Sequence, residues 1–352
     1  MAKVLFRVDA GQEHGLGHLQ RCLSLAAALK RDGIGCTFMV LDDPTVAQRI
    51  ELVGFTVSPA TETSGTPPDV AEVVAVAERN ACGAIVVDSY SISPDYLAGL
   101  RASGRFIAVI DDLASISFPC QLVINGAAHA PRLRYRASDP EMVFLLGPRY
   151  VLLRPEFWTH PATRDAEAPP RVLLTAGGSD PLDLVPHMLE VVARLAAIFA
   201  VDVIVGPFFH NVSTIEQTAK GVRREVDLHI APTSVRPIME HATVAVSAAG
   251  QTLYELACVG CPTIAIQTAE NQRGQLEALA AAGAVYPVAE AAQPARLAEA
   301  VPALLADRQR REAMSAAGQR LVDGQGALRV AEAITAGLSR GMARSASSIR
   351  EK

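Results

Sequence analysis

The decisive stretch of this sequence reads Gly15-Leu16-Gly17-His18-Leu19-Gln20-Arg21-Cys22. It follows a short apolar strand at residues 4–8 and opens an amphipathic helix that we expect at residues 18–31. A strand, a glycine-rich turn and a helix in this order are the parts of a ligand site in an open α/β sheet. The N–H groups at the helix start are suited to an anion. Because imidazole exchanges protons near neutral pH, the pattern predicts a site in which His18 performs the chemistry.

The alternation of strands and helices continues through the first half of the chain. Strands are expected at residues 36–41, 55–57, 84–87, 106–110, 122–124 and 142–146, and helices at residues 45–53, 70–80 and 94–103. Residues 58–68 are rich in Thr, Ser, Gly and Pro, which predicts a surface loop. Strands separated by helices are typical of βαβ units and a parallel sheet.

A second series begins after a stretch with several prolines. Strands are expected at residues 171–175, 201–205, 228–230, 243–247 and 263–266, and helices at residues 184–196, 211–219, 234–241, 251–259 and 272–282, with three more helices from there to residue 338. We therefore predict an α/β protein with two doubly wound, Rossmann-like domains and an inter-domain cleft, a GT-B-like architecture. The predicted parts are an amino-terminal domain (1–150), a linker (151–170), a carboxy-terminal domain (171–326), a terminal helix (327–340) and a tail (341–352). Architecture alone decides no function.

Composition and charge exclude several classes of protein. The chain has 352 residues, of which half are hydrophobic, and a formal net charge of −5, so nothing points to nucleic acid or to an acidic membrane surface. No apolar run reaches the length of about 18 residues that a membrane span needs, and no signal peptide is evident. The six cysteines form no zinc pattern, and we expect buried or half-buried thiols in a reducing cytoplasm.

Two residues on the first helix are the candidates for chemistry in the first domain. His18 and Arg21 are three positions apart and share one helix face. The alternatives are that His18 only caps or packs, and that Arg21 only forms a salt bridge. A nicotinamide site is disfavoured, because Leu19, Gln20 and Arg21 stand where its fingerprint needs a final glycine. Two acidic segments, Asp88-Ser89-Tyr90 and Asp111-Asp112, end strands at the same edge of the sheet. For each segment taken alone, a structural role is favoured over a catalytic one.

Small residues follow two strands of the second domain. Gly177-Gly178-Ser179-Asp180 and Ser247-Ala248-Ala249-Gly250 each lead into a helix, and such turns present N–H groups to phosphate. The alternative for the first is an ordinary turn with a Ser or Asp N-cap. Glu255 lies near the start of its helix and is a candidate to accept hydrogen bonds from a ribose diol. The alternative is that it only stabilises the helix N-terminus as an acidic residue.

Two further patterns bear on ligands. Asn271-Gln272 offers uncharged groups for hydroxyls or amides, with an Asn N-cap as the alternative. The histidines share no spacing, so we assign no metal, and we predict no cofactor.

Taken together, these motifs resemble one family. Arg7-x-Asp9, Gly15-x-Gly17-His18-x-x-Arg21-Cys22-Leu23, Asp88-Ser89-Tyr90, Gly177-Gly178-Ser179-Asp180, Ala249-Gly250 with Glu255, and Asn271-Gln272 occur in order. The combination looks like the UDP-sugar hydrolases of pseudaminic acid biosynthesis, which are GT-B-fold relatives of the MurG-type glycosyltransferases. The resemblance covers about residues 3–326. Gly11-Gln12-Glu13-His14 and Gln251 depart from the family pattern.

The resemblance implies a reaction and a set of site residues. It implies that UDP leaves UDP-2,4-diacetamido-2,4,6-trideoxy-β-L-altropyranose, with His18 as base on a water, Glu255 holding UDP, Asn271 contacting substrate and Tyr90 lying near the sugar. The predicted substrate-binding residues are Asp9, Gly17, Arg21, Tyr90, Asn271 and Gln272, and the predicted UDP-binding residues are Gly177, Gly178, Ser179, Ile230, Ala249, Gly250, Gln251, Thr252 and Glu255. The rival hypotheses are a glycosyltransferase that uses a UDP-sugar donor, and a nucleotide-sugar-binding subunit without turnover.

Overall fold

The chain divides into two compact units. The computed structural model describes residues 2–11, 17–159, 169–288 and 294–350. The first unit comprises Met1–Pro155 and Gln325–Lys352, and the second comprises Glu156–Gly324. The carboxy-terminal segment therefore belongs to the first unit, whereas we predicted that it stands apart, after a second domain ending at residue 326.

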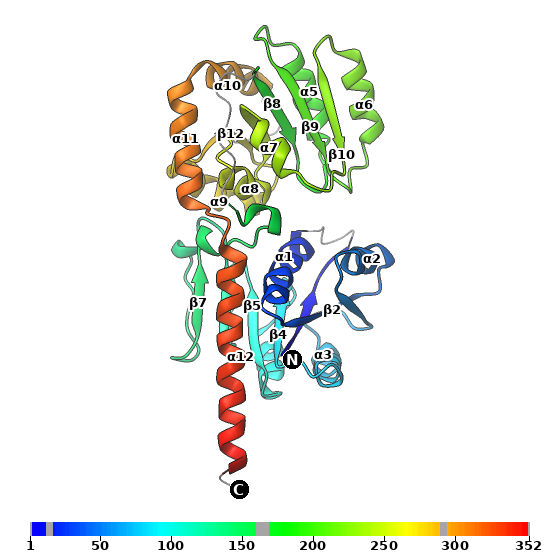
Figure 1. Ribbon diagram of the computed structural model, residues 1–352, viewed down its shortest axis with the longest axis vertical. Helices are drawn as coiled ribbons and strands as arrows, with labels where there is room; N and C mark the ends of the chain where they lie inside the picture. The colour runs from blue at the N-terminus through cyan, green and yellow to red at the C-terminus, as the bar shows by residue number, and fades with distance from the viewer. Residues whose placement is uncertain (1, 12–16, 160–168, 289–293, 351–352) are drawn as a thin grey trace. The chain divides into compact units, whose positions relative to one another are not determined.

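A parallel sheet forms the centre of the first unit (Figure 1). Within the described ranges it has seven strands in the order β3-β2-β1-β4-β5-β6-β7. They are β1 (Lys3–Val8), β2 (Gly35–Leu41), β3 (Thr56–Ala60), β4 (Ala84–Asp88), β5 (Phe106–Ile110), β6 (Leu122–Asn125) and β7 (Val143–Leu146). The chain moves outward from β1 to β3 and then returns to β4 on the other side of β1. The order thus reverses between β1 and β4, the position at which open α/β sheets bind ligands.

Local sequence explains where the helices of this unit start. They are α1 (Gly17–Arg31), α2 (Pro44–Leu52), α3 (Pro67–Arg79) and α4 (Pro94–Ala102). The last three begin with proline, and the side chains of Asp43, Thr66 and Ser93 accept hydrogen bonds from N–H groups of the first turn. These are favourable first and capping residues. All five residues of the central strand β4 are buried, as a sheet covered on both faces requires, whereas four of the five residues of the edge strand β3 are exposed or half-buried.

The terminal helix α12 (Gly326–Arg350) packs on the first unit, against α1 and β5 (Figure 1). A Cβ at Gly337 would lie 2.3 Å from the Phe106 ring, so the absence of a side chain there permits the close approach of helix and strand. Our expected tail at 341–352 needs correction, because the helix continues to Arg350.

A second parallel sheet forms the centre of the second unit. In the part of the chain that is described it has six strands in the order β10-β9-β8-β11-β12-β13. They are β8 (Arg171–Thr175), β9 (Ala200–Val205), β10 (Val226–Ile230), β11 (Val244–Ala248), β12 (Thr263–Ile266) and β13 (Val285–Val288). The order reverses between β8 and β11. The sequence analysis missed β13, an edge strand that pairs with β12.

Helices surround this second sheet. They are α5 (Leu184–Ala193), α6 (Val212–Gly221), α7 (Arg236–His241), α8 (Thr252–Cys258), α9 (Arg273–Ala281), α10 (Pro294–Ala306) and α11 (Arg308–Leu321). Apolar residues of the strands pack with those of α5, α10 and α11 into one core. No helix in the described part of the chain combines the length and the apolar character of a membrane span.

Candidate active site

His18 and Asp88 meet at the reversal point of the first sheet. His18 lies in the first turn of α1, directly after β1, and Asp88 is the last residue of the neighbouring strand β4. The His18 Nδ1 atom lies 2.5 Å from Asp88 Oδ1. His18 is 8% exposed and Asp88 is fully buried. The predicted meeting of helix start and strand end is therefore present, with a carboxylate against the imidazole.

The contact determines which imidazole nitrogen is available for chemistry. An ionised carboxylate only accepts hydrogen bonds, so Nδ1 carries the proton and donates it to Asp88. Nε2 of the neutral ring then has a free lone pair, and it makes no hydrogen bond with the described residues. This is the arrangement of a histidine that acts as a general base.

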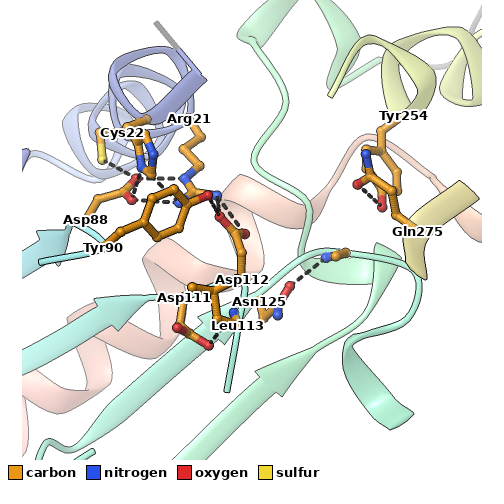
Figure 2. Close-up of polar contacts among 12 residues, drawn as sticks. Arg21, Cys22, Asp88, Tyr90, Asp111, Asp112, Leu113, Asn125, Tyr254 and Gln275 are labelled. Atoms are coloured by element: carbon orange, nitrogen blue, oxygen red, sulfur yellow. Dashed lines mark hydrogen bonds and ion pairs between the residues drawn. The ribbon is translucent and has the colours of Figure 1, made fainter. Parts of the chain in front are cut away.

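Arg21 ties this pair to a second carboxylate (Figure 2). Its Nε and Nη2 donate to the two oxygens of Asp88, both at 2.6 Å, and its Nη1 donates to both oxygens of Asp112 at 2.8 and 2.9 Å. Tyr90 donates its hydroxyl to Asp112 Oδ2 at 2.7 Å. The predicted salt bridge of Arg21 is thus present, and it joins the ends of β4 and β5. We call these five residues, His18, Arg21, Asp88, Tyr90 and Asp112, the charge cluster.

The electrostatics of the charge cluster fix its ionisation states. Burial alone would raise the pKa of Asp88, but the Arg21 guanidinium and His18 hold it well below its usual range. Burial opposes the charge on Arg21, yet Asp112 and Asp88 raise its pKa well above the ordinary value. Both groups therefore stay charged, and Asp88 stays an acceptor for Nδ1 at every pH of interest.

Two neighbours of Asp88 are excluded as nucleophile and base by the same electrostatics. Burial and the Asp88 charge raise the pKa of the Cys22 thiol, which donates to Asp88 Oδ2 at 3.3 Å. Burial and Asp112 likewise raise the pKa of Tyr90. Both groups stay protonated at neutral pH.

Tyr90 is the part of the charge cluster that faces outward. Its ring meets the His18 ring edge-on, with 4.7 Å between the ring centroids, and the residue is 49% exposed. Because its hydroxyl is bound to Asp112, the ring is held in place beside the imidazole. An aromatic face next to the candidate base is consistent with the predicted position near the substrate.

Asp9 and Gly17 occupy different environments at this edge. Asp9 is buried and accepts a hydrogen bond from Ser64 at 2.6 Å, and Ser64 also contacts the hydroxyl of Ser89. The predicted surface loop at residues 58–68 therefore needs correction. Residues 58–60 belong to β3, residues 67–68 begin α3, and Ser64 between them is 3% exposed and anchored to the sheet edge. Gly17 opens α1, and a Cβ there would meet nothing within 4 Å. The predicted Gly15 and Leu16 lie outside the described residues.

The glycine turn after β8 lies beside the start of α8 in the second unit. A Cβ at Gly177 would lie 3.3 Å from Thr252 Oγ1, so the two predicted UDP-binding motifs are brought together at the reversal point of the sheet. Gly177 has φ +89°, which favours glycine. Added Cβ atoms at Gly178 and Gly250 would meet nothing within 4 Å, so both backbones are approachable.

One part of the expectation for this turn was wrong. We predicted that Gly177–Asp180 leads directly into the helix. The helix α5 begins only at Leu184, and the buried Asp180 accepts hydrogen bonds from the backbone N–H groups of Leu184 and Val185, at 2.8 and 2.9 Å. The start of α5 is thus capped from within, and the exposed Gly178 and Ser179 remain as candidates.

The segment after β11 leads directly into α8. Ala249 is buried and its N–H donates to Ile266 O, while Gln275 donates to its carbonyl. Gln251 is the N-cap residue of α8, and its side chain forms no capping hydrogen bond. Glu255, in the first turn of α8, is 7% exposed. Gln275 also accepts from the Tyr254 hydroxyl (Figure 2). These hydrogen bonds hold the turn in one conformation.

The remaining predicted residues lie at two other strand ends. Ile230, the last residue of β10, is 50% exposed. Asn271 is exposed within a short 3-10 helix (Glu270–Gln272), and neither it nor its neighbours form the alternative Asn cap. The side-chain oxygen Oε1 of Gln272 accepts hydrogen bonds from Thr268 N and Oγ1, so this side chain closes its own loop.

Sequence reasoning placed Asp88 and Asp112 at the correct edge but favoured structural roles for them. The strand order β1-β4-β5 would have indicated a shared site, because the residues that follow three neighbouring parallel strands lie close together at one edge of the sheet. Within the described ranges, no group of three or more His, Cys, Asp or Glu side chains is arranged to hold a metal ion.

Comparisons with known proteins agree with this architecture. A model of the glycosyltransferase family 28 C-terminal domain matches residues 172–328. MurG of Acinetobacter baumannii superimposes with a TM-score of 0.70 and 13% identity, over 95% of this chain and 99% of that one. The fold is that of the GT-B glycosyltransferases. Anabaena HepE, solved with UDP-glucose, has a TM-score of 0.62 and 15% identity, over 97% of this chain and all of that one.

Three curated relatives are similar in sequence. An uncharacterised protein, MJ1062 of Methanocaldococcus jannaschii, is 22% identical over 77% of this chain and 57% of its own length. The UDP-2,4-diacetamido-2,4,6-trideoxy-beta-L-altropyranose hydrolase of Campylobacter jejuni is 22% identical over 80% of this chain and 97% of its own length. The spore coat polysaccharide biosynthesis protein SpsG of Bacillus subtilis is 26% identical over 59% of this chain. The chain spans 62% of the length of SpsG, so it covers somewhat more than half of two of these relatives.

Proposed function

We propose that this protein hydrolyses a UDP-sugar, releasing UDP and a free sugar. The observation that carries the proposal is the contact of His18 Nδ1 with Asp88 at 2.5 Å, which leaves Nε2 as a free base. In a doubly wound sheet this nitrogen lies where ligands bind. A base without a covalent nucleophile beside it favours attack by water.

The reaction balances with the groups at hand. His18 Nε2 takes a proton from water, the water oxygen bonds to the anomeric carbon, and the bond from that carbon to the UDP oxygen breaks. Attack opposite the leaving group inverts the anomeric centre. UDP is a good leaving group, so it departs with little acid assistance. Asp88 stabilises the imidazolium that forms, and base catalysis of this kind contributes about 10²–10⁴-fold.

The second unit supplies the binding of UDP in this proposal. Gly178, Ser179 and Gly250 offer backbone N–H groups to the diphosphate, and Glu255 accepts hydrogen bonds from the ribose diol. Ile230 packs against the uracil ring. The match to the glycosyltransferase family 28 C-terminal domain over residues 172–328 supports the assignment of UDP binding to the second unit.

The substrate we propose is UDP-2,4-diacetamido-2,4,6-trideoxy-β-L-altropyranose, with the free sugar passing on to pseudaminic acid. The similarity to the hydrolase of Campylobacter jejuni over 97% of that protein supports this choice. Tyr90 lies against the sugar, and Asp9, Gly17, Arg21, Asn271 and Gln272 are the further proposed contacts. We propose no metal or cofactor, and a cytoplasmic location.

The second candidate is a glycosyltransferase that uses a UDP-sugar donor. The same family match and the MurG-like fold favour it, because the charge cluster of the first unit serves equally well to deprotonate an acceptor hydroxyl. The two candidates differ only in what enters beside His18.

The test measures UDP release from the altrose-configured UDP-sugar without an acceptor and with a chelator present. Hydrolysis predicts steady release that His18→Ala lowers by about 10²–10⁴-fold, while UDP affinity stays unchanged. UDP binding without release, and transfer to a supplied hydroxyl acceptor, would establish the transferase instead. Full activity of the His18→Ala variant would exclude His18 as the base.

A further inference from the structure

The turn that follows β5 carries Asp112 into the charge cluster. Asp111, the residue before it, accepts hydrogen bonds through Oδ2 from the N–H groups of Leu113 and Ala114, at 3.1 and 2.7 Å. Ala114 is in the left-handed region with φ +52°, which costs a non-glycine residue energy. The turn is therefore held in an unfavourable conformation by the side chain of Asp111.

Tyr135 fastens this turn from outside the charge cluster. Its hydroxyl donates to the same Oδ2 of Asp111 at 2.5 Å and accepts from Asn125 Nδ2 at 2.9 Å. Asn125 is fully buried at the end of β6, and its Oδ1 accepts from Ala127 N. The ring of Tyr135 packs at 5.9 and 5.6 Å from those of Phe118 and Phe144. Packing and hydrogen bonds thus fix the hydroxyl in one place (Asp111 and Asn125 are labelled in Figure 2).

We propose that Tyr135 is a positioning residue for the reaction. It acts through Asp111 on the turn, and the turn places the Asp112 carboxylate. Asp112 in turn binds Arg21 and Tyr90, and Arg21 binds Asp88, the partner of His18. Asp111 and Asp112 are neighbours in the chain, and every other link in this path is a hydrogen bond of 2.5 to 3.1 Å. The groups that form these bonds have little freedom to adopt other positions. The kinetic part of this inference rests on the proposed function, but the structural part does not.

The chain contains a matched control for Tyr135. Tyr96 also donates its hydroxyl to a buried carboxylate, Asp69, at 2.6 Å. Both tyrosines pack against the same apolar core of the first unit. Asp69, however, binds Arg7 and has no contact with the charge cluster. Tyr96→Phe therefore removes a comparable hydrogen bond without touching the proposed path.

The first measurement compares kcat and KM of Tyr135→Phe and Tyr96→Phe for UDP release. A displaced catalytic group costs up to about 10²-fold when it moves by about 1 Å, and we expect Tyr135→Phe to lower kcat by about tenfold. KM is expected to change less than kcat, because the proposed UDP-binding groups lie in the second unit and only the proposed sugar contacts Arg21 and Tyr90 are bound to Asp112. Tyr96→Phe should lower thermal stability to a similar extent and leave kcat within about twofold.

The second measurement needs no turnover. The Nε–H of Arg21, which donates to Asp88, is observed by NMR as a side-chain resonance that Arg21→Lys identifies. We expect its hydrogen exchange to be about fivefold faster in Tyr135→Phe, because loss of one hydrogen bond is worth about 1 kcal/mol, and unchanged in Tyr96→Phe. Asp111→Ala, which removes the oxygen that accepts from Tyr135 and from the two backbone N–H groups, should follow Tyr135→Phe.

The outcomes separate this inference from the proposed function. Faster exchange at Arg21 in Tyr135→Phe alone, with no UDP release from any variant, would support the positioning network and overturn hydrolysis. Equal behaviour of Tyr135→Phe and Tyr96→Phe in exchange and in kcat would overturn the positioning role. Loss of kcat without faster exchange at Arg21 would also overturn it, because the effect would then bypass Asp112.

Discussion

The reversal points of the two sheets have the same topology but different chemistry. In the first unit, charged side chains lie at the ends of β1, β4 and β5. The residues of the charge cluster form hydrogen bonds of 2.5 to 2.9 Å with one another. In the second unit, the ends of β8 and β11 carry glycines, and two of them, Gly178 and Gly250, face open space. One edge is built from side chains and the other from backbone.

The proposed function accounts for this difference. A base must be held in one tautomer and one orientation, which requires buried partners of fixed charge. A diphosphate is large and anionic, and backbone N–H groups receive it only if side chains leave room. Under this proposal, the same fold position becomes a reaction site in one unit and a binding site in the other through the residues that follow the strands.

The largest effect is expected from Asp88→Asn. The amide donates to His18 Nδ1 where the carboxylate accepted, so the ring turns to the tautomer that carries its proton on Nε2. The free base is then lost, and kcat for UDP release should fall by about 10²–10⁴-fold. UDP affinity, measured by calorimetry, should stay the same because the second unit is untouched.

Asp112→Asn is the control for that variant. It weakens the ion pair with Arg21 but leaves Asp88 on His18, so kcat should fall less than in Asp88→Asn. Equal losses in the two variants would mean that the charge of the cluster matters and the tautomer does not.

Glycine substitutions test the other side of the comparison. Gly250→Ala adds a Cβ to open space, so the melting temperature should stay unchanged while Kd for UDP rises about tenfold, equal to about 1.4 kcal/mol. Gly177→Ala instead strains a backbone at φ +89° and should destabilise the unit by about 1–3 kcal/mol. Gly221→Ala, also open within 4 Å but at the end of α6, is the control that should leave Kd unchanged. A Kd unaffected by Gly250→Ala would remove this turn from the UDP site.

The fold was largely predictable because its central strands, such as β1, β4 and β11, are buried on both faces. Residues 84–87 form a continuous apolar run between helical segments, and β4 lies there. The strand β13 was missed because Val285-Tyr286-Pro287-Val288 is short, contains proline and follows an Ala-rich segment. The end of α12 was missed because residues after 340 lack apolar periodicity, although Ala, Arg and Ser continue a helix once it has formed.

The site was predictable only as far as local motifs reach. His18 and Arg21 are visible as one helix face after a strand. Asp88 and Asp112 needed the strand order, since 70 residues separate His18 from its partner. Tyr135 gave no signal at all, because its hydrogen bond to Asp111 depends on tertiary packing across 24 residues without a motif.

The pH dependence of stability sharpens the comparison within the first unit. The pKa of Asp88 is lowered in the folded chain, so its stabilising effect is complete above about pH 4, the usual pKa of an unfolded Asp, and is lost as the pH falls further. Burial raises the pKa of Asp111, so its contribution has the opposite sign and is lost as the pH rises through its folded pKa. Denaturant unfolding at pH 3 to 7 should therefore show the advantage of the wild type over Asp88→Asn shrinking in acid. In acid, the free energy of unfolding of the wild type should rise relative to that of Asp111→Asn.

The smallest effect is expected at Ile230, which tests whether the binding edge also uses a side chain. The residue ends β10 and is 50% exposed, so a uracil ring can bury only half of it. Full burial of an Ile side chain is worth about 1.5–3 kcal/mol, and half of that predicts a rise in Kd for UDP of about fivefold in Ile230→Ala. Ile198, 92% exposed and located before the start of β9, lies at the opposite edge of the same sheet. Ile198→Ala should therefore leave Kd unchanged, and an equally unchanged Kd in Ile230→Ala would mean that the Ile230 side chain does not touch the nucleotide.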